Sequence, residues 1–203
     1  EVHMVNWQRW IPLALGAVFF LLGCEDKIYS IVSKEAVGEQ KLLIVPVRFP
    51  DVEPGITKRE VGNKIFNRLN RYLKIVSYKK AHLSGHVTDW YTLPKPLAEY
   101  RVSRSNLKLE HGRVNDLVQT VLNMVESSPN QHLLGSHRYV LIHLGATVDQ
   151  YGMMALCPYP GLETIMEELK PFKTAGGRIV RGVTIACRNA HVGVLFHDLA
   201  HML

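Results

Sequence analysis

The sequence predicts a mixed α/β fold, with helices and strands in an α+β arrangement around one mixed sheet. Three observations support this prediction. A chain of 203 residues that is 47% hydrophobic and 21% charged suits one globular domain with a sizeable core. Mostly apolar runs at 41–49 and 138–145 are typical of buried strands. Apolar residues recur at helical spacing within 57–76 and 113–126, which predicts amphipathic helices that pack on the sheet.

Residues 1–24 are interpreted as an export signal. Arg9 precedes an apolar run at 11–23, which is shorter than the roughly 20 residues of a spanning helix and fits a signal peptide. Because the run ends in Leu-Leu-Gly-Cys, we expect Cys24 to be lipidated, as in bacterial lipoproteins. An ordinary signal peptide and an uncleaved anchor are the alternatives. All three predict an extracytoplasmic protein, membrane-anchored or secreted, with a linker at 25–40.

The domain proper is expected to begin at residue 41 with the strand KLLIVPVRF at 41–49. Pro46 lies within this strand and indicates an edge position or a bulge, because proline cannot donate a ladder hydrogen bond. Thr57 and Glu60 have the spacing of a capping box, which predicts a helix start. The apolar positions of that helix are Val61, Ile65, Leu69, Tyr72, Leu73 and Val76.

The later elements are predicted from the same two periodicities. The segment 86–93, HVTDWYTL, alternates as a strand does and ends before Pro94. The other predicted elements are a helix at 113–126, strands at 138–145 and 178–187, and a short helix at 162–169. The last strand leads into an apolar helix that extends to Leu203.

That final helix carries the clearest chemical signal. His197 and His201 are four residues apart, so their side chains share a helix face and can bind one metal ion. A catalytic zinc site also needs a third protein ligand and a carboxylate that takes a proton from water. Asp198 stands where H-E-x-x-H proteins carry this carboxylate. The alternative is two histidines on a partly buried helix.

Four segments in this order resemble the secreted zinc metalloproteases of the immune inhibitor A family. They are LLIVPVRFPD at 42–51, YLKIVSYKKAHLSGHVTDWYTLP at 72–94, YVLIHLGA at 139–146, and the metal helix. The resemblance implies that 41–203 is the amino-terminal part of a zincin-like metalloprotease domain with a zinc cofactor and a protein or peptide substrate. It also implies that His197 and His201 are zinc ligands and that Asp198 occupies the place of the general base.

Two features depart from the family pattern. The family's acid is normally glutamate, and aspartate is one methylene shorter, so reduced or altered activity is expected. The family also supplies an acidic third ligand after the second histidine, and none follows up to Leu203. The domain is therefore expected to be incomplete at its carboxyl end. The alternative function is a catalytically weak or inactive lipoprotein of the same fold that acts as a binding module.

Other metal sites are less favoured by the sequence. A His-Asp pair also occurs in metal-dependent phosphohydrolases, but those are wholly helical, and the predicted strands argue against that class. Asp51 and Asp149 are loop carboxylates of the kind that bind structural Ca²⁺, although a turn-forming role is favoured. The other histidines considered lie in or near predicted strands or the start of the last helix, and they are His82, His86, His143 and His191.

The cysteines allow one pairing. If Cys24 carries lipid, Cys157 and Cys187 remain as a pair in an oxidising or permissive compartment. We expect a disulfide between them, and two separately buried thiols are the alternative.

The net charge of +6 does not predict nucleic-acid binding. Its densest cluster comprises Arg68, Arg71, Lys74, Lys79 and Lys80. No aromatic-interleaved or glycine-rich nucleic-acid motif accompanies this cluster, so we interpret it as a solvated helix face.

Overall fold

A computed structural model describes residues 36–103, 110–158 and 172–203. Val37–Leu203 form one compact unit. The predicted signal peptide, the lipidation site at Cys24, most of the linker and the predicted helix at 162–169 lie outside the described residues. Among the helices in the described ranges, none is long and apolar enough to cross a membrane.

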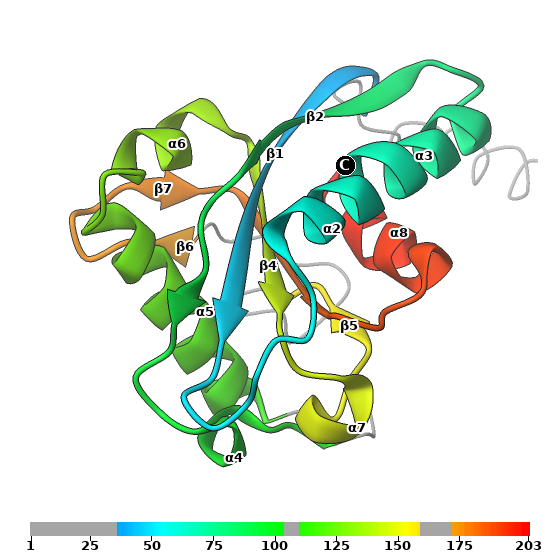
Figure 1. The fold of residues 1–203 in the computed structure, drawn as a ribbon. Helices are drawn as coiled ribbons and strands as arrows, with labels where there is room; N and C mark the ends of the chain where they lie inside the picture. Colours follow the sequence, from blue (N-terminus) through cyan, green and yellow to red (C-terminus); the bar gives the residue numbers. More distant parts are fainter. Residues whose placement is uncertain (1–35, 104–109, 159–171) are drawn as a thin grey trace, which may run out of the picture. The chain divides into compact units, whose positions relative to one another are not determined.

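A mixed sheet forms the centre of the unit (Figure 1). Its strands in spatial order are β2 (Ala81–Val87), β1 (Gly38–Arg48), β4 (Tyr139–Leu144), β8 (Gly182–Cys187) and β5 (Ala155–Leu156). The short strand β3 (Tyr91–Thr92) pairs with the end of β1. All neighbours run parallel except β5, which is antiparallel to β8. The predicted mixed sheet is therefore confirmed, and β1 begins three residues before the predicted domain start.

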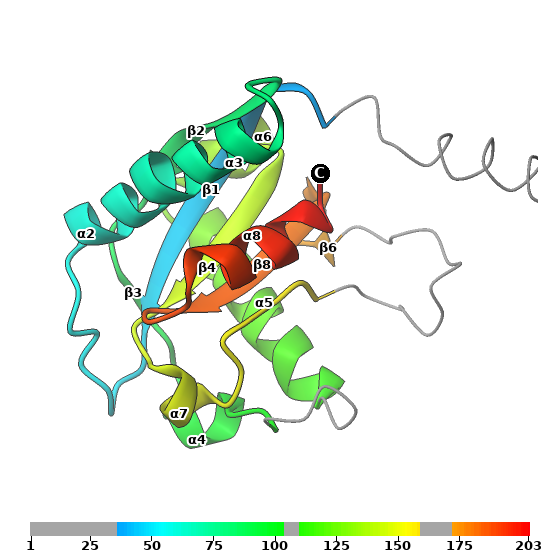
Figure 2. The same cartoon turned by 90° about the vertical axis from the view of Figure 1, so that its right-hand side faces the viewer.

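Helices cover both faces of this sheet (Figure 2). Helix α5 (His111–Glu126) packs on one face. The opposite face carries α8 (Val192–Ala200) and one long helix made of α2 (Lys58–Gly62), the π-helical η2 (Asn63–Leu69) and α3 (Asn70–Val76). Successive side chains of a strand point to opposite faces. Because helices cover both faces, the central strands carry apolar side chains on both. This explains their continuous apolar runs.

The local signals for the two long helices are confirmed. Thr57 and Glu60 form both hydrogen bonds of the predicted capping box at the start of α2. The predicted apolar positions of α5 are all buried, and they are Val114, Leu117, Val118, Val121, Leu122 and Val125. Three short helices were not predicted, because four to six residues are too few to show a helical period. They are α4 (Leu97–Tyr100), α6 (Gln131–Ser136) and α7 (Val148–Tyr151).

Strand β1 lies in the middle of the sheet, which corrects the edge or bulge expected from Pro46. Even-numbered residues of β1 direct their peptide groups towards β2 and β3. The Ile44 carbonyl accepts from the Thr88 N–H at 3.0 Å, and the Arg48 carbonyl accepts from the Leu93 N–H at 2.8 Å. Pro46 falls between them, where β2 has ended and β3 has not begun. Its missing N–H therefore leaves no ladder bond unmade.

Two predicted strands are divided. The segment predicted as one strand at 86–93 contributes only the end of β2 and the two residues of β3. The strand predicted at 178–187 comprises β7 (Ile179–Val180) and β8. Strand β7 pairs with β6 (Phe172–Lys173) in a separate two-stranded sheet, whereas β8 joins the main sheet. The chain changes its pairing partner at Arg181, between β7 and β8.

The turn between α3 and β2 places two residues in the left-handed region, Tyr78 at φ 52° and Lys79 at φ 63°. In this region a residue with a Cβ atom reduces the free energy of unfolding by roughly 1–2 kcal/mol, and glycine does not. Lys79→Gly should therefore raise the free energy of unfolding by about 1 kcal/mol, measured by chemical denaturation. Lys80→Gly is the matched control and should not stabilise, because Lys80 has no positive φ. An unchanged or lower stability for Lys79→Gly would contradict this account.

Candidate active site

Helix α8 follows β8 as predicted and packs its apolar side on the sheet. Leu195 and Leu199 are fully buried in the core on this face. Phe196 packs edge-on against Tyr72 of α3, with ring centroids 5.1 Å apart. Residues four apart share a helix face. Leu195 and Leu199 therefore occupy the face towards the sheet, and His197 and His201 occupy a different, exposed face.

The two predicted metal ligands lie together on α8 and at its end. The Nε2 atoms of His197 and His201 are 3.3 Å apart, and their rings meet edge to face with centroids 4.8 Å apart. Two nitrogen ligands about 2.0–2.1 Å from a tetrahedral zinc ion would be roughly 3.3–3.4 Å apart. The same separation permits an N–H···N hydrogen bond without metal. Both histidines are exposed on a partly buried helix, so the pair faces solvent.

No third ligand joins the pair in the described part of the chain. Within residues 36–103, 110–158 and 172–203, no group of three His, Cys, Asp or Glu side chains could hold a metal ion. Asp51, a weaker calcium candidate, accepts a hydrogen bond from the Leu97 N–H at 2.9 Å. It thereby caps the start of α4. Asp149 lies in the first turn of α7.

Asp198 lies beside the histidines but on the buried side of α8. The residue is 9% exposed, and the backbone N–H of Cys157 donates a hydrogen bond to its carboxylate. Burial raises the pKa of Asp198, and the nearby rings of His197 and His201 oppose this shift. The hydrogen bond holds the carboxylate at the residue that follows β5, the edge strand of the described sheet.

Cys157 and Cys187 are thiols that form no disulfide with each other, which corrects the expected pairing. Leu156 lies opposite Ile185 in the β5–β8 ladder, so Cys157 and Cys187 are offset by three residues along the strands. That offset is about 10 Å, and bridged cysteines need Cα atoms within about 7 Å. The thiols instead donate to separate carbonyls, Cys187 to Met153 at 3.0 Å and Cys157 to Val183 at 3.4 Å. Burial raises the pKa of Cys187 to about 12.

The structure also shows two further basic residues that influence each other electrostatically, the buried His143 and the half-buried Lys64. His143 on β4 is fully buried, and neither ring nitrogen has a hydrogen-bond partner in the described structure. Burial, followed by the charge of Lys64, lowers the pKa of His143 to about 3. Lys64 on η2 donates to the Arg188 carbonyl at 2.8 Å, and burial lowers its pKa to about 8. From the sequence, His143 was considered only as a metal ligand, although its place within the apolar run of β4 already indicated burial.

The described residues therefore place two imidazoles and one buried carboxylate on the same helix, beside the edge strand of a mixed sheet. The two imidazoles fit two corners of a zinc site, and the carboxylate occupies a dry environment next to them. Comparison of this chain with protein-family models and with curated proteins finds no match in either set.

Proposed function

We propose that this chain is an exported, zinc-dependent peptidase of the kind implied by its resemblance to the immune inhibitor A family. His197 and His201 bind the zinc ion, and Asp198 acts as the general base. The observation that carries the proposal is the 3.3 Å separation of the two Nε2 atoms, which matches two ligands of tetrahedral zinc. The zincin-like fold belongs to the same proposal. It is supported by the packing of α8 on the sheet directly after β8.

Zinc and Asp198 have separate roles in the proposed peptide hydrolysis. A bound zinc ion would supply Lewis-acid activation of water and of the scissile carbonyl. Asp198 takes the proton from the attacking water, which requires an approach of about 2.6–3.2 Å directly or through one water. An extended peptide that pairs with the edge strand β5 would pass the carboxylate of Asp198. The hydrogen bond from Cys157 keeps that carboxylate in place.

Zinc binding should depend on both histidines. Two imidazoles supply half of a tetrahedral shell, so the 203-residue chain should bind zinc weakly, with a Kd of roughly 1–100 µM. A chain that also supplies a downstream acidic ligand should bind much more tightly. Isothermal titration calorimetry should show at least a tenfold loss of affinity for His197→Ala and for His201→Ala. His191→Ala, which removes an exposed histidine outside the pair, is the control. Equal affinity in all three variants would disprove the site.

Export is proposed from Arg9, the apolar run at 11–23 and Cys24. In bacteria that express the chain, a labelled fatty acid should be incorporated into the protein in the membrane fraction. Cys24→Ala should abolish the label, whereas Cys157→Ala should retain it. Recovery of the full-length, unmodified chain from the cytosol would contradict the proposal.

A binding module of the same fold is the second candidate function. It is favoured by the aspartate at 198 and by the lack of a third metal ligand among the described residues. Such a module would bind an extracytoplasmic protein partner without cleaving it. Zinc bound without cleavage of a peptide library, even by Asp198→Glu, would favour this function over the peptidase.

A further inference from the structure

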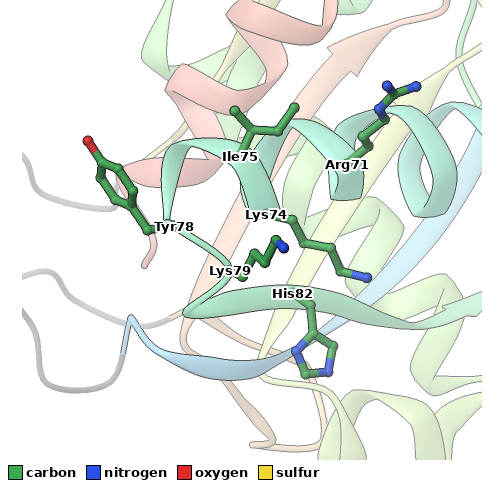
Figure 3. Close-up of a pocket in the computed structure, with 6 residues that line it drawn as sticks. All are labelled: Arg71, Lys74, Ile75, Tyr78, Lys79 and His82. Carbon is green, nitrogen blue, oxygen red and sulfur yellow. The ribbon is translucent and has the colours of Figure 1, made fainter.

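The junction of α3 and β2 bears an exposed surface that the proposed active site does not use. We call it the α3–β2 patch (Figure 3). It surrounds a depression of about 750 Å³ and consists of Arg71, Lys74, Ile75, Tyr78, Lys79 and His82. Tyr78 is 86% exposed and Ile75 is 65% exposed. Two large apolar side chains thus face solvent among three cationic ones.

A constrained turn keeps the ring of Tyr78 outside the core. The Lys79 N–H donates to the Lys74 carbonyl at 2.7 Å, and the Lys80 N–H donates to the Ser77 carbonyl at 3.0 Å. The left-handed φ angles of Tyr78 and Lys79 belong to this turn. In Figure 3, Tyr78 projects away from the end of α3, while Lys74 and Lys79 lie between α3 and β2.

The charge of the patch has one sign. Arg71, Lys74 and Lys79 line it, and among the described residues no Asp or Glu does. An acidic residue near the patch is Glu39, which lies opposite His82 in the β1–β2 ladder. Its carboxylate is 3.9 Å from the ammonium of Lys41, which offsets its charge. A lysine or arginine close to an anionic bilayer increases binding about fivefold. Three such cations with two exposed apolar side chains match an interfacial lipid-binding surface.

The patch also lies where the chain enters the compact unit. The Gly38 N–H donates to the Lys80 carbonyl at 2.7 Å, so the start of β1 is attached to the turn that carries the patch. Cys24 precedes Gly38 by 14 positions. A chain of this length reaches at most about 50 Å, so a lipid on Cys24 would hold Gly38 within about 50 Å of the bilayer.

Strand addition by a partner is disfavoured at this corner. Strand β2 lies at the edge of the described sheet, but the two outward N–H groups nearest the patch are hydrogen-bonded within the chain. The Leu83 N–H donates to Asn70 Oδ1 at 2.8 Å, and the Ala81 N–H donates to Ser77 Oγ at 3.1 Å. These side chains occupy the positions that an added strand would need.

We propose that the α3–β2 patch docks on a membrane surface rich in anionic phospholipid. Arg71, Lys74 and Lys79 bind lipid phosphates, while Tyr78 and Ile75 enter the headgroup region. The location of the patch at a membrane rests on the export and anchoring at Cys24 proposed above. The recognition of anionic lipid rests on the patch alone and is independent of zinc and of catalysis.

Hydrogen exchange measured by mass spectrometry on the full chain tests this docking locally. The chain is mixed with vesicles of phosphatidylcholine, with or without 30% phosphatidylglycerol. Amides within 71–82 should exchange at least about fivefold more slowly on the anionic vesicles only, and 0.5 M salt should remove the protection. The double variant Lys74→Glu/Lys79→Glu should lose it, since two reversed charges lower binding at least about 25-fold. Tyr78→Ser should weaken it.

The matched control is Lys173→Glu/Arg181→Glu, which reverses two exposed charges outside the patch and should keep the protection. Equal protection on neutral and anionic vesicles, or its persistence in the Lys74→Glu/Lys79→Glu variant, would overturn the proposal. Protection that grows with protein concentration without vesicles would instead identify a second copy of the chain as the occupant. A chain without fatty acid on Cys24 would refute the anchor, yet the vesicle measurement would still decide the lipid preference.

Discussion

In a chain extended to supply the downstream acidic ligand, Asp198→Asn should abolish peptide hydrolysis while zinc stays bound. A general base contributes about 10²–10⁴-fold to the rate, and an amide cannot accept the proton. The asparagine Oδ1 can still accept the hydrogen bond that the Cys157 N–H gives to Asp198, so the fold should be retained. The measurement pairs the cleavage rate of a quenched fluorescent peptide with the zinc content of the same sample.

Asp198→Glu is the matched variant and should increase hydrolysis. The added methylene extends the carboxylate by roughly a bond length towards the reacting water, which is the usual reach of this motif. Zinc content should again be unchanged, because residue 198 is not a ligand in the proposal. Full activity in Asp198→Asn would exclude this residue as the base, and loss of zinc in that variant would make it a ligand instead.

Acid should destabilise the fold strongly through His143. Its pKa is about 3 in the folded chain and about 6.5 when unfolded. Between these values the unfolded chain binds a proton that the folded chain does not, so stability falls as the pH drops from 6.5 to 3. At about 1.4 kcal/mol per pH unit, the loss approaches 5 kcal/mol. Urea denaturation at pH 7, 5.5 and 4.5 should show about 2.7 kcal/mol of this loss by pH 4.5.

His143→Leu should remove most of this slope. Leucine has a similar volume and leaves no unpartnered nitrogen in the core, so stability at pH 7 should be equal or higher. The difference between wild type and variant is the quantity to compare, because burial raises the pKa of Asp198 and this group acts in the opposite direction. His86→Gln, at an exposed position, should keep the wild-type slope. An unchanged slope in His143→Leu would contradict the assignment.

The sequence by itself determined the features that depend on neighbouring residues. The capping box at Thr57 and Glu60, the apolar stripe of α5 and the run of β4 were all confirmed. The four-residue spacing of His197 and His201 likewise determined that their rings would meet. These features could be predicted because helical and extended backbones repeat within a few residues, so that side-chain positions follow from spacing alone.

Only the tertiary structure decided the features that depend on which strands pair and in what register. Pro46 lies in a central strand because β2 ends beside it. Cys157 and Cys187 miss each other by a three-residue offset between β5 and β8. The ring of His143 has no hydrogen-bond partner among the described residues because β4 lies between β1 and β8. The charge of Lys64 on η2 also acts on this ring. Strand register pairs residues more than 25 positions apart, so no local sequence pattern predicts it. A shift of one residue would move every side chain of a strand to the opposite face of the sheet.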